Sequence, residues 1–181
     1  MIESILCLAT AIYFESRSEP VEGQIAVGAV IMNRVQDDRW PENVCDVVKQ
    51  GRHWRGHPIR HQCQFSFYCD GLSDDPKNRQ AFGQAVLLSL PLVLKMTPDP
   101  TGGSLFYHAN YVQPQWAGTP TITIGDHKFY ASAEGSSEQS YRLAQGGNIK
   151  QTESLPNIGG TLFNGEDIYS MRDHAQSRRK R

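Results

Sequence analysis

A carboxylate stands at the end of an apolar N-terminal segment. Glu15 follows Tyr13 and Phe14, and residues 2–16 repeat apolar side chains at spacings of three and four. Apolar neighbours exclude water, which disfavours the charged form of a carboxyl group and raises its pKa. An acid that keeps its proton can donate it to the oxygen of a glycosidic bond. Glu15 is therefore a candidate general acid, and the alternative is a surface carboxylate beside Arg17.

A second carboxylate, Glu19, follows four positions later, between Ser18 and Pro20. Those two residues favour a break between helices, with Ser18 as the cap of the next helix and Pro20 in its first turn. The break leaves the separation of the two carboxylates open. Glu19 is a candidate for binding substrate, and the alternative is an acid that only stabilises the N-terminus of the next helix.

Four helices are expected to position these acids. Apolar periodicity predicts helices over 2–16, 20–36 and 41–50, and a fourth that resumes at Asp75-Pro76 with a stop or kink near Pro91. The second helix is apolar on most sides and should be the central buried one. Asn33 and Arg34, at its end, are expected to be structural ties rather than ligands.

The rest of the chain is predicted to contain loops and short strands. Residues 51–75 are expected to be a loop, and short strands are expected over 104–108, 121–124 and 127–131, the last two as a hairpin. The fold class is therefore α+β and mainly helical, with a small antiparallel hairpin element. We expect a catalytic domain over 1–131 and a polar, flexible C-terminal tail with a basic end over 132–181.

Four strings in this order resemble the SleB/CwlJ-type cell-wall hydrolases, which include the spore-cortex-lytic enzymes and their bacterial and phage relatives. The strings are 11–35, 44–48, 63–67, and 99–103 leading into 106–109. The resemblance covers roughly residues 6–131 and implies a lysozyme-like domain that cuts peptidoglycan glycan strands between MurNAc and GlcNAc. It also implies that Glu15 is the catalytic acid. The usual Glu-Ala-Arg-Gly-Glu pattern is Glu15-Ser16-Arg17-Ser18-Glu19 here, so both acids are kept.

The single-Glu site that the resemblance implies favours lytic transglycosylase chemistry. Once the bridging oxygen is protonated, the 6-hydroxyl of MurNAc can close a 1,6-anhydro ring, with Glu15 as the base. If Glu19 or another acid holds a water, the outcome is muramidase hydrolysis. Neither route uses a cofactor, and we expect none.

Five other residues are candidates for binding the sugar. Gln64, Phe65 and Ser66 follow a polar loop, where Gln64 could donate hydrogen bonds and Phe65 could stack; Phe65 and Phe67 could equally be core aromatics. Tyr107 and His108 are expected on one strand, so only one of them faces the groove. Tyr107 is preferred, because its hydroxyl could orient Glu15 or the N-acetyl group.

The loop over 49–61 is basic and rich in histidine. His53, His57 and His61, with Cys63 and Cys69 behind them, could suggest zinc, but Gly56 and Pro58 argue against a single helix face, and we expect no metal. Lys49, Arg52, Arg55 and Arg60 could hold the carboxylates of stem peptides or an anionic wall polymer. The rival functions are thus a zinc-stabilised, non-catalytic module that binds an anionic polymer, and a cell-wall amidase.

Composition excludes several classes of protein. A net charge of −1 over 181 residues argues against nucleic-acid binding, and the apolar run Val86–Leu94 is broken by Ser89 and Pro91, so we expect no membrane insertion. We expect a monomer whose partner is the peptidoglycan strand.

The N-terminus lacks a secretory pattern. We therefore expect synthesis in the cytoplasm and action on the wall after release, as a phage endolysin or virion-associated enzyme, or export by another route.

The four cysteines are too few for a disulfide scaffold and are expected to start as thiols. After export, pairing among Cys45, Cys63 and Cys69 would leave Cys7 as a buried thiol.

Overall fold

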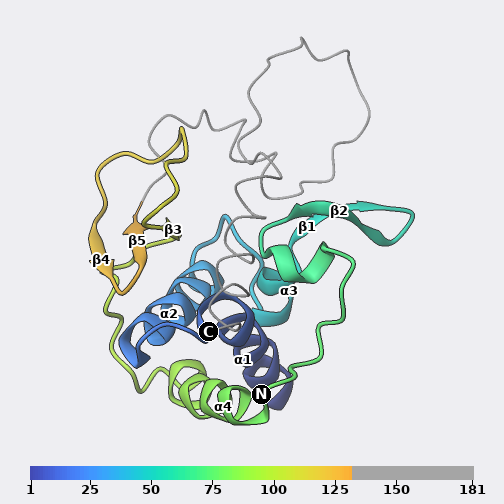
Figure 1. Cartoon of the computed structure of the whole chain (residues 1–181), viewed down its shortest axis with the longest axis horizontal. Coiled ribbons are helices and arrows are strands. Elements are labelled where there is room, and N and C mark those ends of the chain that lie inside the picture. The colour runs from blue at the N-terminus through green and yellow to red at the C-terminus, as the bar shows by residue number, and fades with distance from the viewer. Residues whose placement is uncertain (132–181) are drawn as a thin grey trace.

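Three helices form the body of the protein. The computed structural model describes residues 1–131. In it α1 (Ile2–Ser16), α2 (Val21–Gln36) and α4 (Arg79–Val93) pack together, and a short α3 (Val44–Val48) lies against α1 and α2. Figure 1 shows α4 along one side of the other helices, with the two small β-sheets lying apart from each other away from it. The mainly helical α+β class is as predicted.

Helix α2 is the central buried helix, as its composition predicted. Ala26, Val27, Val30 and Ile31 are all fully buried. Side chains of α1 and α4 approach α2 closely at Gly28, since a Cβ there would be 2.7 Å from Leu92 Cδ1 and 2.9 Å from Ile12 Cδ1. The absence of a side chain at Gly28 therefore allows the three helices to pack at this distance.

Substitution of this glycine should separate the helices. Gly28→Leu would force a side chain between two buried residues, and we expect the free energy of unfolding to fall by about 2 kcal/mol. Gly83→Leu is the matched control, because a Cβ at Gly83 in α4 would meet nothing within 4 Å. There Leu should raise the free energy of unfolding by about 0.5 kcal/mol through helix propensity. Denaturant unfolding of both variants measures the difference, and equal effects would contradict this packing.

The segment predicted as a loop contains a hairpin. Strands β1 (Gly51–Trp54) and β2 (His57–Cys63) pair antiparallel, and the 3₁₀ helix η1 (Ser66–Cys69) follows. Arg55 and Gly56 form the two-residue turn with φ of 51° and 83°, the left-handed conformations that such hairpin turns require. The loop prediction was wrong because most side chains of this hairpin are polar and exposed, so no alternation of apolar residues marks the strands.

The second sheet is built around the predicted hairpin, which is confirmed. Strands β3 (Phe106–Ala109), β4 (Ile122–Ile124) and β5 (His127–Tyr130) form an antiparallel sheet in the order β3-β5-β4. Tyr107 of β3 pairs with Phe129 of β5. The sheet packs on α2 through Phe129, which is fully buried with Ala26, Val27 and Val30. The register of β3 against β5 therefore fixes the position of Tyr107 relative to α2.

Several helix boundaries differ from those predicted. Helix α4 begins at Arg79 rather than at Asp75-Pro76, because the side chain of Asn78 accepts the Ala81 N–H as its N-cap. It also continues past Pro91 to Val93. Pro91 forfeits only the hydrogen bond to Leu87, which is 73% exposed and can be solvated. Likewise α3 starts after an Asn43 cap, and Ser18 does not cap α2, whose N-cap is Pro20.

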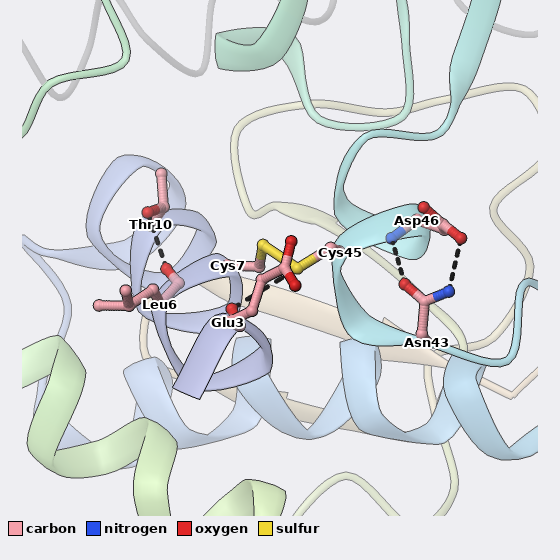
Figure 2. The surroundings of a disulfide bond; sticks show 7 residues. All are labelled: Glu3, Leu6, Cys7, Thr10, Asn43, Cys45 and Asp46. Carbon is pink, nitrogen blue, oxygen red and sulfur yellow. Dashed lines mark hydrogen bonds between the residues drawn. A yellow bond between two sulfur atoms is a disulfide. The ribbon is translucent and has the colours of Figure 1, made fainter. Parts of the chain in front are cut away.

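Two disulfides cross-link the described residues. Cys7 of α1 is bonded to Cys45 of α3 with a Cα–Cα distance of 5.3 Å, and Cys63 is bonded to Cys69. Figure 2 shows the first bond bridging the two helices, beside Glu3, whose carbonyl lies 3.5 Å from Cys45 Sγ. The expectation of a buried free thiol at Cys7 was wrong. The contact between α1 and α3, which the sequence does not show, brings Cys7 and Cys45 together.

Two further predictions concern membrane insertion and the C-terminal tail. No helix within residues 1–131 is both long and apolar enough to cross a membrane. The predicted tail over 132–181 lies outside the described residues.

Candidate active site

The last turn of α1 sends three consecutive side chains in different directions. Tyr13 is buried toward α4, where its hydroxyl accepts the N–H of Asn78 at 3.0 Å. Phe14 stacks on Phe67 of η1 with ring centroids 4.9 Å apart. Successive residues of an α-helix point about 100° apart. Because two of the directions are occupied by these aromatic contacts, the side chain of Glu15 is left pointing at β3.

Tyr107 of β3 faces Glu15. Its hydroxyl donates to Glu15 Oε2 at 3.4 Å, and the Glu15 residue is half-buried. Burial, together with the negative charge of Glu15, raises the pKa of the Tyr107 phenol well above its usual value. The phenol therefore keeps its proton at any physiological pH and serves as a neutral donor to the carboxylate. The length of this hydrogen bond makes it a weak one.

Arg34, at the end of α2, holds the start of β3. Its side chain is 5% exposed, its Nε donates to the carbonyl of Leu105 at 2.8 Å, and its guanidinium lies 4.3 Å from the ring centroid of Trp40. Asn33 donates to the carbonyl of Ser104 and to Asp99. The prediction that Asn33 and Arg34 are structural ties is confirmed. Together they fix the chain just before Tyr107.

The turn after α1 is tied to the hairpin of β4 and β5 by Glu19. Its Oε2 accepts the N–H of Asp126 at 2.8 Å and lies 3.8 Å from His127 Nδ1, and the side chain is 6% exposed. Gly125 has a φ of 58°, and any Cβ there would collide with the Glu19 carboxylate. Glu19 thus anchors the hairpin that carries β5, which in turn pairs with Tyr107.

His127 lies beside Tyr107 and Glu19, and the sequence did not single it out. Its ring lies 5.4 Å from that of Tyr107, edge to face, and its side chain is 8% exposed. His127 and Phe129 share one face of β5 and both contact Tyr107. The alternation of these two residues just after the predicted Gly125-Asp126 turn was the available signal.

Three further sequence candidates lie at or just before the start of η1. Phe65 is 2% exposed within the helical core, beneath Arg34, so a sugar ring cannot stack on it. Gln64 is half-buried and its backbone N–H donates to the carbonyl of Gln50, and Ser66 opens η1. The structure therefore joins Tyr107 to Glu15 and leaves Phe65 in the core.

His108 lies on the other face of β3 from Tyr107. Its Nε2 is 2.7 Å from the hydroxyl of Tyr130, and its ring stacks on that of Tyr130. Burial lowers the pKa of His108, with a smaller contribution from the positive charge of Lys128. A neutral, buried imidazole paired in this way holds the sheet together rather than facing Glu15.

The histidine-rich hairpin does not assemble a metal site in the part of the chain that the structure describes. Cys63 and Cys69 are bonded to each other and so present no thiolates. Within residues 1–131, no three His, Cys, Asp or Glu side chains converge as metal ligands do.

The contact of Tyr107 with Glu15 makes a prediction for activity. The resemblance to cell-wall hydrolases implies wall lysis. In Tyr107→Phe the rate of any such lysis should fall about tenfold, because the carboxylate loses a donor while the ring packing is kept. Sedimentation with insoluble sacculi should show unchanged binding, because the Tyr107 hydroxyl is engaged with Glu15. A fall in binding with an unchanged rate would place Tyr107 among the substrate contacts instead.

Comparison with known proteins gives the family. The model of the cell wall hydrolase family matches residues 18–130, so Glu19 lies within the match and Glu15 three residues before it. The spore cortex-lytic enzyme of Oceanobacillus iheyensis is 33% identical over 131 residues, which cover 69% of this chain and 40% of that protein. The enzyme of the same name from Bacillus cereus is 35% identical over 128 residues, covering 69% and 43%. The chain thus spans about two fifths of the length of these curated relatives.

Two solved structures share the fold. The catalytic domain of the Bacillus cereus SleB protein aligns with a TM-score of 0.51 and 28% identity, covering 72% of this chain and 91% of that one. The catalytic domain of the germination-specific lytic transglycosylase SleB from Bacillus anthracis aligns with a TM-score of 0.54 and 30% identity, covering 72% and 95%. These alignments confirm the predicted fold and the resemblance to SleB. The chain belongs to the cell wall hydrolase family.

Proposed function

We propose that the chain cleaves the β-1,4 bond between MurNAc and GlcNAc in peptidoglycan, with Glu15 as the general acid and base. The observation that carries this proposal is the half-buried Glu15 carboxyl group, aimed by the last turn of α1 at the neutral hydroxyl of Tyr107. Membership of the cell wall hydrolase family supports the choice of substrate.

Each proton in the reaction passes through Glu15. Its carboxylic acid donates a proton to the bridging oxygen, the glycosidic bond breaks, and the anomeric carbon of MurNAc becomes oxocarbenium-like. The resulting Glu15 carboxylate then removes a proton from the attacking hydroxyl, which restores the acid for the next cycle. The Tyr107 hydroxyl, which keeps its own proton, holds the carboxyl group in one orientation throughout.

Glu15 is a better general acid than Glu19 because of what each carboxylate already does. Glu19 accepts the backbone N–H of Asp126 and is almost completely buried by the hairpin. The Glu19 carboxylate is therefore engaged by the hairpin and shielded from a polymer substrate. Glu15 instead faces the hydroxyl of Tyr107.

The same assignment favours an intramolecular attack over hydrolysis. With Glu19 engaged by the hairpin, it is not available to activate a water opposite Glu15, and the 6-hydroxyl of MurNAc is the nearest internal nucleophile. The Bacillus anthracis relative is described as a lytic transglycosylase, which supports this choice. The products would then end in 1,6-anhydro-MurNAc.

Chemical assays of the digested wall test the proposal against its two rivals. Purified sacculi treated with the protein should release glycan fragments without new free amino groups. New amino groups on an uncut glycan would identify an amidase. Binding to sacculi with neither product would identify a non-catalytic module, and either result would overturn the proposal.

A further inference from the structure

We infer that the hairpin of β1 and β2 is a second substrate contact, which binds the carboxylates of peptidoglycan stem peptides through Arg52 and Arg55. This inference rests on the proposed function for the identity of the polymer. It extends that function from the cleaved sugar bond to the peptide that branches from it.

The charge of this hairpin is uniformly basic. From residue 47 to residue 69 the chain contains no Asp or Glu, while it contains Lys49, Arg52, Arg55 and Arg60. Arg52 and Arg55 are exposed, and neither forms a salt bridge with a carboxylate in the described part of the chain. Arg60 differs, because its Nε donates to the carbonyl of Asp70 and holds the hairpin to the end of η1. Two guanidinium groups are thus available to an anion.

The tip of the hairpin also presents an aromatic ring. Trp54 is 68% exposed, and the guanidinium of Arg55 lies 5.8 Å from its ring centroid. Trp and Arg are the residue types enriched among the residues that contribute most to protein binding surfaces. The planar guanidinium can hold a carboxylate with two hydrogen bonds, while the indole covers the apolar part of the same peptide.

A short series of contacts links the hairpin to the candidate active site. Cys63 at the end of β2 is bonded to Cys69 at the end of η1. Phe67, within η1, stacks on Phe14, which immediately precedes Glu15. Few contacts therefore separate the hairpin from the catalytic carboxylate. Figure 1 shows the hairpin and the sheet of β3, β4 and β5 on either side of the helices. Stem peptides on a glycan strand bound at Glu15 would extend to either side of it.

Sedimentation with intact sacculi tests this inference in the full chain. All proteins carry Glu15→Gln, so that the sacculi are not digested. The double variant Arg52→Gln and Arg55→Asn, in which Asn suits the left-handed conformation at position 55, should bind about tenfold more weakly at low salt. The difference should shrink at high salt. Lys77→Gln with Arg79→Gln is the matched control, since both residues are exposed and lie outside the hairpin, and it should bind as the parent does.

Two further substrates identify the anion. On glycan strands stripped of stem peptides by an amidase, the double variant and its parent should bind equally. The difference in binding between the double variant and its parent could instead disappear only when phosphate polymers are removed from the sacculi, or be reproduced on anionic lipid vesicles. Either result would assign the hairpin to another partner and overturn the inference. Equal binding of the double variant and its parent to intact sacculi would also overturn it.

These measurements do not depend on turnover. If Glu15 is not the general acid, Glu15→Gln should lyse sacculi at the wild-type rate. If the hairpin does not bind stem peptides, the failure appears only in the binding comparison. Trp54 offers an independent readout, because Trp40 and Trp116 are both 5% exposed. Soluble muropeptides should reduce the quenching of tryptophan fluorescence by acrylamide more in wild type than in Trp54→Ala. An equal reduction in both proteins would contradict contact at the hairpin tip.

Discussion

Glu15→Gln should reduce the lysis of purified peptidoglycan by about a thousandfold, the effect expected from losing a general acid that also acts as the base. The amide has nearly the shape of the carboxylic acid and can still accept the hydrogen bond from Tyr107, so the fold should be kept. It cannot donate the required proton. Turbidity loss of a sacculus suspension measures the rate, and thermal unfolding checks that the variant is folded.

Two other carboxylates serve as comparisons. Glu22→Gln removes an exposed acid from the first turn of α2 and should lyse sacculi as wild type does. Glu19→Gln keeps an oxygen that can accept the Asp126 N–H, so we expect most of the rate to remain. A thousandfold loss in Glu19→Gln with a nearly normal rate in Glu15→Gln would transfer the role of acid to Glu19.

Replacing Cys7 and Cys45 together by Ser should lower the free energy of unfolding by about 4 kcal/mol, which is a large share of the stability of a typical domain. The bond closes a segment with a sequence separation of 38, and a longer closed loop restricts the unfolded chain more. Denaturant unfolding without reductant measures the change. Since α1 carries Glu15, the variant should also lose lysis at temperatures where wild type is still active.

The second disulfide provides the matched control. Cys63 and Cys69 are separated by only 6 positions, so their replacement by Ser should cost about 2 kcal/mol. If the two double variants were equally stable, the effect of loop length would be contradicted. If neither differed from wild type, the bonds would contribute nothing to the folded state.

The sequence predicts best where apolar side chains recur at helical spacing or where turn residues stand together. The helices α1 and α2 and the hairpin around Gly125 follow from periodicity and turn residues. The place of Glu15 after Tyr13 and Phe14 makes it a candidate acid. These are local properties, which the side chains of neighbouring residues determine. The family resemblance rests on such local strings as well.

What the sequence does not predict depends on contacts between distant segments. The role of Glu19 is set by the backbone N–H of Asp126, 107 positions away. The pairing of Cys7 with Cys45 requires α1 to lie against α3. The hairpin of β1 and β2 escapes detection because its polar side chains carry no alternation. Phe65 was ambiguous because an aromatic residue serves equally well in a core or in a sugar site, and only the structure shows it buried.

Mass spectrometry of the soluble fragments that wild type and Glu15→Gln release from the same sacculi tests the central claim most directly. Wild type should release muropeptides ending in 1,6-anhydro-MurNAc, each lighter by one water than its reducing counterpart, and Glu15→Gln should release almost none. Stem peptides freed from an uncut glycan, or the same anhydro fragments in equal yield from both proteins, would contradict it.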